Sequence, residues 1–396
     1  MRIGFDAKRL YNNFTGLGNH SRTTIDILTA EFPENEYFLY TPKIRLNDVT
    51  RPYTERKGCH TVLPQGVVKG SIWRTCGLVS DLKRDGIELF HGLSNEMPVG
   101  MFHSGIASVV TIHDVAFRTF PDMYHWHDRK IYNAKWQYAC NHSDRIIAIS
   151  ECTKRDVMEF YNVPEHKVDV VYQPVNPRYY RPIADIDGIE TIDSIDTINS
   201  MDSINSISSI KSTPNKPLHS PYMLYVGSIN SRKNLLGIVK AMELMPKDLL
   251  MPLKVVGGGG SYKQMVREYI AEHGMEYLFE WTETIDNAEL QSLYANAQMM
   301  VYPSFYEGFG LPVVEAQLSG CPVVTSNVSS LPEAGGPYAL QADPNSPEDI
   351  CNQMVKLLTD EEFRQAQIKG GRQYAMQTFH PSVLARRLMD VYNKCI

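Results

Sequence analysis

Short apolar runs alternate with helix-like stretches along most of the chain, and this alternation constrains the fold more than any other feature. The runs expected to form strands are 2–5, 37–40, 87–90, 107–112, 145–149 and 168–172, followed by 223–226, 253–256, 299–302 and 322–325. The stretches 132–140, 152–160 and 311–318 have the spacing of helices. Strands that alternate with helices form parallel sheets covered by helices. The sequence therefore predicts an α/β fold.

The alternation stops between residues 181 and 220. Within 184–212, isoleucine recurs at 186, 189, 192, 195, 198, 204, 207 and 210, among Asp, Asn, Ser and Thr. A period of three matches neither a strand nor a helix. We interpret 184–212 as a flexible, acidic, low-complexity insertion without a catalytic role. A strip that binds a partner is the alternative.

This interruption divides the chain into two parts of similar size. We expect an N-terminal Rossmann-like domain at 1–180, a linker at 181–220 and a C-terminal Rossmann-like domain at 221–378. The last segment, 379–396, has apolar residues at helical spacing and is expected to pack back towards the N-terminal domain. Ligands bind outside the carboxyl ends of parallel strands, so the cleft between the domains is the expected site.

Composition excludes several classes of protein. The chain has 39 Lys and Arg against 45 Asp and Glu, a net charge of -6, which disfavours a nucleic-acid partner. Seven cysteines without C-x-x-C spacing argue against a disulfide framework or zinc ribbon and fit a reducing cytosol. The start, MRIGFDAKRLY, lacks the apolar core of a signal peptide. We expect a cytoplasmic protein that requires no metal and no cofactor.

Two glycine-rich stretches could meet a phosphate. Gly16-Leu17-Gly18 is expected as a loop between the first strand and a helix, where backbone N–H groups bind anions. Ser21 stands where a dinucleotide fingerprint requires its third glycine. Tyr262 interrupts a run that begins at Gly257 in the same way. These departures disfavour an oxidoreductase, and the first loop is either a phosphate contact or a tight turn.

A second candidate is the segment 228–234, which follows the expected strand at 223–226. It begins at Ser228 and carries Arg232 next to Lys233. Arginine offers a bidentate fork to phosphate oxygens and lysine a point charge. The pair suits a diphosphate, and a solvated turn is the alternative.

The most informative stretch is 302–316, which contains two carboxylates eight residues apart. Glu307 lies in a glycine-flanked loop after a strand, and Glu315 lies in the following helix. A carboxylate can accept bidentate hydrogen bonds from ribose or sugar hydroxyls. The pattern therefore favours a site for a nucleotide or a sugar.

The stretch reads Y-P-S-F-Y-E-G-F-G-L-P-V-V-E-A, which resembles the E-x7-E signature of retaining glycosyltransferases of family 4. Further motifs of that family are similar in the same order: V-V-T-I-H-D at 109–114, S-E-C-T-K at 150–154, L-Y-V-G at 224–227 with R-K-N at 232–234, and L-P-E at 331–333. The resemblance covers nearly the whole chain outside 184–212. It implies the GT-B architecture, in which two Rossmann-like domains face each other and the C-terminal one holds the donor.

The resemblance also implies roles for individual residues. Glu315 would hold the ribose, and Arg232 with Lys233 would neutralise the leaving diphosphate. Glu307 would bind the transferred sugar, together with the backbone of Gly308, Phe309, Gly310 and Leu311. Ser228 would line the donor site, Gly16 and Gly18 would face the diphosphate from the other domain, and His113 would lie near the sugar. A His at a strand end can instead be a hydrogen-bonded structural residue.

The implied activity is transfer of a hexose from a nucleotide diphosphate sugar to a hydroxyl, with retention at the anomeric carbon. The first expectation is mannose from GDP-mannose, moved to a glycan or lipid-linked glycan in surface polysaccharide synthesis. Peripheral contact with the inner membrane face would follow. The alternatives are a sugar-nucleotide epimerase or phosphorylase of the same fold, or a non-catalytic binder of nucleotide sugars.

Overall fold

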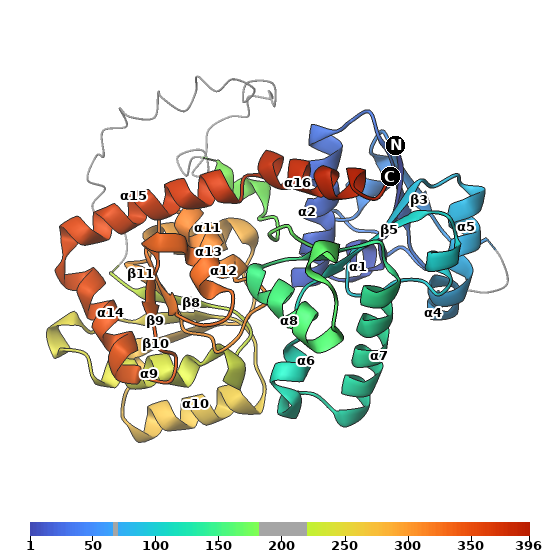
Figure 1. The fold of residues 1–396 in the computed structure, drawn as a ribbon. Helices are drawn as coiled ribbons and strands as arrows, with labels where there is room; N and C mark the ends of the chain where they lie inside the picture. The colour runs from blue at the N-terminus through green and yellow to red at the C-terminus, as the bar shows by residue number, and fades with distance from the viewer. Residues whose placement is uncertain (66–69, 182–219) are drawn as a thin grey trace.

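The computed structural model describes residues 1–65, 70–181 and 220–396, which form two parallel sheets flanked by helices (Figure 1). The first sheet has the order β3-β2-β1-β4-β5-β6-β7 and the second β10-β9-β8-β11-β12-β13. The strands of the first are β1 Arg2–Asp6, β2 Glu36–Tyr40, β3 Cys59–Val62, β4 Leu89–Gly92, β5 Ala107–Ile112, β6 Arg145–Ala148 and β7 Val168–Val170. Those of the second are β8 Met223–Val226, β9 Leu253–Val256, β10 Phe279–Thr282, β11 Met299–Tyr302, β12 Val323–Ser326 and β13 Leu340–Ala342.

Helices cover both sheets. Those on the first are α1 Lys8–Asn12, α2 Gly16–Glu31, α3 Arg51–Glu55, α4 Gly70–Ile72, α5 Leu78–Arg84, α6 Ala116–Thr119, α7 Trp126–His142 and α8 Glu151–Tyr161, with a π-helical turn at Trp73–Gly77. Those on the second are α9 Leu235–Glu243, α10 Ser261–Glu272, α11 Asn287–Asn296, α12 Leu311–Leu318, α13 Leu331–Gly335, α14 Pro347–Thr359 and α15 Glu361–Thr378. Among the described residues, no helix is long and apolar enough to cross a bilayer.

The central strands are buried on both faces, as parallel sheets require. Val109, Val110 and Ile112 of β5 are fully buried in the first sheet, and all four residues of β11 are fully buried in the second. Mainly apolar runs of this kind made these strands visible in the sequence. The predicted α/β fold with two Rossmann-like sheets is confirmed.

The last helix, α16 Pro381–Asn393, leaves the second sheet and lies beside α2 of the first (Figure 1). Leu384, Leu388 and Tyr392 are buried in the core of the first sheet. The hydroxyl of Tyr392 also lies 2.7 Å from Nδ1 of the buried His91. The end of the chain is thus built into the half in which the chain begins.

The structure differs from the sequence expectation at the first glycine motif. The prediction of a loop at Gly16–Gly18 between the first strand and a helix is wrong, because α1 intervenes after β1 and α2 already begins at Gly16. Both glycines therefore lie in the first turn of a helix. The isoleucine repeat at 184–212 lies outside the described residues.

Candidate active site

The candidate site lies where loops at the carboxyl ends of strands from the two sheets meet. The loop after β11 carries Glu307, the loop after β8 carries Lys233, and His113 directly follows β5. Gly308 approaches His113 so closely that an added Cβ would lie 2.2 Å from the carbonyl oxygen of His113. The two sheets therefore present their binding edges to each other across this contact.

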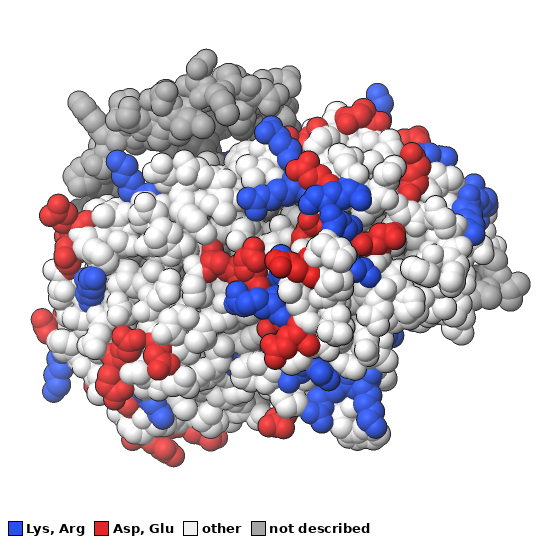
Figure 2. Space-filling view, in the orientation of Figure 1, with Lys and Arg blue, Asp and Glu red and all other residues white. Residues whose placement is uncertain are grey.

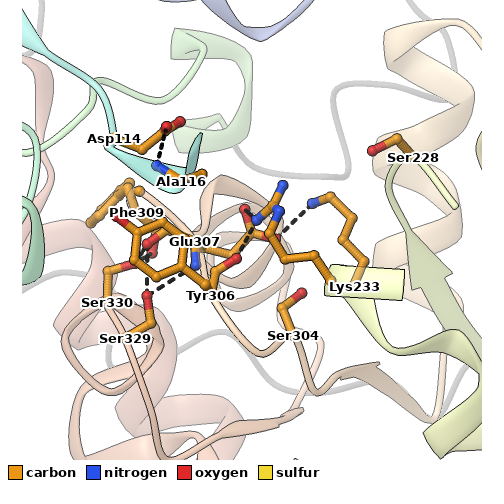
Figure 3. Close-up of polar contacts among 12 residues, drawn as sticks. Asp114, Ala116, Ser228, Lys233, Ser304, Tyr306, Glu307, Phe309, Ser329 and Ser330 are labelled. Atoms are coloured by element: carbon orange, nitrogen blue, oxygen red, sulfur yellow. Dashed lines mark hydrogen bonds and ion pairs between the residues drawn. The ribbon is translucent and has the colours of Figure 1, made fainter. Parts of the chain in front are cut away.

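Glu307 lies at the centre of a buried charge cluster, which we call the Glu307 cluster and which consists of Glu307, Arg232, Lys233 and Tyr302. Figure 3 shows the ion pair between Glu307 and Lys233. Its Oε2 is 3.0 Å from Nη1 of Arg232, and its Oε1 is 2.8 Å from Nζ of Lys233. The hydroxyl of Tyr302 donates to Oε1 at 3.0 Å. β8 and β11 are neighbours in the sheet, so their end loops bring these residues together.

The cluster fixes the charge of its members. Burial alone would raise the pKa of Glu307, but Lys233 and Arg232 outweigh burial and lower that pKa to about 2. Burial alone would lower the pKa of Arg232, and Glu307 instead raises it above its ordinary value. The carboxylate is therefore ionised at every physiological pH. It holds two cations that could bind a diphosphate.

Serine side chains fix the backbone of the loop that carries Glu307. The amide of Glu307 donates to Oγ of Ser329 at 2.9 Å, and that hydroxyl donates to the carbonyl of Glu307 at 2.8 Å (Figure 3). Ser330 donates to the carbonyls of Glu307 and Phe309. Gly310 has φ +118°, a conformation that favours glycine, and α12 begins at Leu311 directly after it.

Phe309 itself is a core residue. Its ring is 2% exposed and packs against Tyr172 and Phe379, with ring centroids 5.4 and 5.3 Å away. The buried ring leaves only the backbone of Phe309 for the predicted contact with a ligand.

The loop with Arg232 and Lys233 is held by two asparagines. Oδ1 of Asn230 accepts from the amide of Lys233 at 3.2 Å. Asn234 has φ +57° and donates to the carbonyls of Pro303 and Pro344 at 3.2 and 2.7 Å, which ties this loop to the loop of Glu307. Ser228, in contrast, is exposed and lies apart from the cluster (Figure 3).

Glu315 lies outside the Glu307 cluster. It is on α12, and its Oε2 accepts from the hydroxyl of Tyr294 at 3.2 Å. Burial raises the pKa of Glu315 to about 7. The two carboxylates of the 302–316 stretch therefore have opposite pKa shifts, because one faces two cations and the other faces a neutral hydroxyl.

His113 is held as a neutral imidazole. Its Nε2 is 2.9 Å from the carbonyl oxygen of Leu93, so this nitrogen carries the proton and donates it. Burial lowers the pKa of His113. The ring is therefore hydrogen-bonded structure in the free protein, and only Nδ1 keeps a lone pair for a ligand.

Sequence reasoning missed His20. Its ring meets that of His113 edge to face, with centroids 4.5 Å apart. The side chain is buried, and neither ring nitrogen has a hydrogen-bond partner among the described residues. A signal was present, since His20 follows Gly16 by four residues and such residues share one face of a helix.

The first turn of α2 keeps part of its anion-binding capacity. Oδ1 of Asn13 accepts from the amide of Gly18 at 3.0 Å, so this N–H is already used. The amides of Gly16 and Leu17 have no acceptor among the described residues. The helix start can therefore offer two N–H groups to a ligand.

A cavity of about 360 Å³ opens beside Arg232. It is lined by Thr119, Phe120, Pro121, Asp122 and Met123 from the first half of the chain and by Ser231, Arg232 and Phe305 from the second. Aromatic rings next to hydroxyl and carboxylate groups suit a sugar ring with its hydroxyls.

Two further contacts join the halves of the molecule. The hydroxyl of Tyr306 donates to Oδ2 of Asp156 at 2.6 Å. The carboxylate of Glu333 accepts from the amides of Glu151 and Cys152 at 2.8 and 3.0 Å, at the start of α8.

Acidic and basic side chains are interspersed around the middle of the molecule (Figure 2). Within residues 1–65, 70–181 and 220–396, His, Cys, Asp and Glu form no group of three that could hold a metal.

Two family models match the chain, one in each half. The model of Glycosyltransferase Family 4 matches residues 27–179, and the model of Glycosyl transferases group 1 matches residues 206–374. Together they span most of the chain and confirm the resemblance. The chain belongs to the family 4 glycosyltransferases.

Curated relatives of this glycosyltransferase include transferases of mannose. The O-antigen chain mannosyltransferase B of Escherichia coli is 29% identical over 299 residues, which are 73% of this chain and 70% of the relative. The D-inositol 3-phosphate glycosyltransferase of Corynebacterium glutamicum is 31% identical over 192 residues, 46% of this chain and 45% of the relative.

Solved structures share the fold at low sequence identity. A sucrose-phosphate synthase from Thermosynechococcus elongatus has a TM-score of 0.72 at 19% identity and covers 100% of this chain and 98% of its own. The Anabaena protein HepE, solved in complex with UDP and glucose, has a TM-score of 0.69 at 14% identity over 100% of both chains. These neighbours confirm the GT-B fold.

Proposed function

We propose that this glycosyltransferase moves mannose from GDP-mannose to a hydroxyl of a glycan or lipid-linked glycan, with retention at the anomeric carbon. The observation that carries the proposal is the Glu307 cluster, in which one carboxylate holds two cations at an edge that faces His113. The relative named as an O-antigen chain mannosyltransferase supports both the sugar and a role in surface polysaccharide synthesis.

Donor binding exchanges partners within the cluster. The diphosphate takes over Arg232 and Lys233, which pair with Glu307 in the free protein. Glu307 then accepts hydrogen bonds from hydroxyls of the sugar, and Glu315 accepts those of the ribose. The amides of Gly16 and Leu17 face the diphosphate from the other side.

The reaction breaks the bond between the anomeric carbon and the phosphate oxygen and forms one from that carbon to the acceptor oxygen on the same face. The acceptor proton passes to the leaving phosphate oxygen. Arg232 and Lys233 stabilise the negative charge that develops there, so the chain itself supplies the positive charge. We further propose that the enzyme acts at the cytoplasmic face of a membrane, because a lipid-linked acceptor would lie in the bilayer.

The experiment is a transfer assay with GDP-mannose, UDP-glucose and ADP-glucose on mannose-terminated glycans, with NMR of the product. We expect an α-mannoside from GDP-mannose and a loss of at least about tenfold in the Arg232→Gln/Lys233→Gln variant. A β-linked product would contradict retention, and transfer from a UDP or ADP donor alone would contradict GDP-mannose.

A further inference from the structure

A second charge cluster lies at the carboxyl edge of the first sheet. We call it the Lys8 cluster; its members are Lys8 and Arg9 of α1, Arg74 of the π-helical turn, Lys135 of α7, and the carboxylates Asp6 and Glu96. None of these residues belongs to the Glu307 cluster, and the donor chemistry above uses none of them.

The ion pairs of the Lys8 cluster leave two cations unmatched. Nε of Arg74 lies 2.7 Å from Oδ2 of Asp6, and Arg74 also pairs with Glu96. Nζ of Lys135 lies 3.2 Å from Oε1 of Glu96. Arg74 and Lys135 thus use both carboxylates. Among the residues that the structure describes, no salt bridge involves Lys8 or Arg9.

The cations repel one another. Burial, then the charges of Arg74 and Arg9, lower the pKa of Lys8. The pKa of Lys135 is lowered by the same causes in the same order. Like charges that gather in a partly buried place disfavour their charged forms, and a bound anion relieves that cost.

The Lys8 cluster lies close enough to His113 for one substrate molecule to contact both. Asp6 is the last residue of β1, and His113 directly follows β5, with only β4 between the two strands. Two strand spacings amount to about 10 Å. An anion held by Lys8 and Arg9 therefore lies within reach of one small molecule that extends to His113.

The local backbone is also specialised there. Arg74 lies in the π-helical turn Trp73–Gly77, a distortion that concentrates at functional sites. An added Cβ at Gly92 would lie 2.3 Å from the carbonyl oxygen of Glu96, so the loop that carries Glu96 closes tightly onto the end of β4.

We propose that Lys8 and Arg9 bind a phosphate group carried by the acceptor, while Arg74 and Lys135 hold the site in place through Asp6 and Glu96. This inference rests on the proposed function, in which Arg232 and Lys233 at the edge of the second sheet bind the diphosphate of the donor. Lysine and arginine side by side suit phosphate oxygens. The acceptor is then a phosphorylated sugar or a sugar linked to a lipid phosphate.

The test is calorimetric titration with inorganic diphosphate of the full chain and three double variants. We expect two sites in the wild type, of which Lys8→Gln/Arg9→Gln weakens one at least tenfold and Arg232→Gln/Lys233→Gln weakens the other. The matched control is Lys57→Gln/Lys83→Gln, two exposed lysines that precede β3 and β4 and so lie at the opposite edge of the sheet. It should keep both sites.

An unchanged titration of Lys8→Gln/Arg9→Gln would overturn the inference. Because the other double variant reports on the donor site alone, failure of the proposed function shows separately, as unchanged binding in Arg232→Gln/Lys233→Gln. Two further titrations then distinguish the two possible sources of the phosphate. Glucose 1-phosphate represents a soluble sugar phosphate, and phosphatidylcholine vesicles that contain phosphatidic acid represent a lipid phosphate. Binding of either that depends on Lys8 and Arg9 supports the site, and the one that binds more tightly indicates a soluble or a lipid-linked acceptor.

Discussion

At the scale of single residues, the chemistry of the site depends on which side chains lie in contact with one another. The sequence indicated the pair Arg232 and Lys233 as one candidate and Glu307 as another, with separate roles. The structure joins them in one cluster, because β8 and β11 are neighbours in the sheet. Strand order does not follow from motifs, so the pairing could not be predicted. His20 was missed because its partner, His113, is far away along the chain.

Removal of the charge at residue 307 should impair transfer. We expect Glu307→Gln to lower kcat/KM by at least about tenfold, equivalent to ~1.4 kcal/mol of transition-state stabilisation. The amide keeps the shape of the side chain but loses the acceptor strength that sugar hydroxyls require. Steady-state kinetics with the natural donor provide the measurement, and an unchanged kcat/KM would refute the role of Glu307.

Glu315 should make stability depend on pH. Its pKa is about 7 when folded and 4.5 ordinarily, so the folded chain binds more protons between these values and loses stability as the pH rises through them. Glu315→Gln removes this loss and should stabilise the protein by about 3 kcal/mol at pH 8 and little at pH 4.5. Thermal unfolding of the wild type and of Glu315→Gln at both pH values provides the measurement. An equal effect at both would show that burial of the charge is not the cause.

At the scale of elements, the sequence predicted the central strands well and missed three of the four edge strands. β5, β8, β9 and β11 are mainly apolar and were predicted with the bounds that the structure has. β3, β10 and β13 are edge strands with polar residues, and no expected strand covered them. An edge strand pairs on one side only, so it needs less apolar surface and gives a weaker signal.

The packing of α16 onto the first sheet offers a test at this scale. Tyr392→Phe removes the hydroxyl that pairs with Nδ1 of His91 at 2.7 Å and leaves that buried nitrogen without its partner. We expect a loss of about 1 to 3 kcal/mol in the free energy of unfolding. Tyr277, which is 76% exposed, supplies the control Tyr277→Phe, which should change little. Equal stability of the two variants in urea unfolding would argue against this role of α16.

At the scale of the whole molecule, the site depends on how the two sheets face each other. Gly308 meets the backbone of His113, Tyr306 bonds to Asp156, and Glu333 bonds to the start of α8. Each contact joins segments more than 100 residues apart, so no local pattern reveals it. The motifs indicated the candidate loops, and the structure adds the contacts that bring those loops together.

Gly308→Ala tests this contact. The added methyl group would lie 2.2 Å from the carbonyl oxygen of His113, so the halves must separate or the loop must shift. We expect transfer to fall at least about tenfold. Donor affinity should stay within a few-fold, because Arg232, Lys233 and Glu315 all lie on the second half. Gly260→Ala, whose Cβ meets nothing within 4 Å, is the control. A Gly308→Ala enzyme with normal transfer would show that the close approach is dispensable.

The most direct test of the account is a thermal-shift panel of GDP-, UDP- and ADP-sugars on the wild type and on Arg232→Gln/Lys233→Gln. A donor at about 100 times its Kd adds ~2.7 kcal/mol of stability. We predict that GDP-mannose raises the melting temperature of the wild type by several degrees and leaves that of the double variant nearly unchanged. An equal shift in both proteins would contradict the claim that Arg232 and Lys233 hold the donor diphosphate.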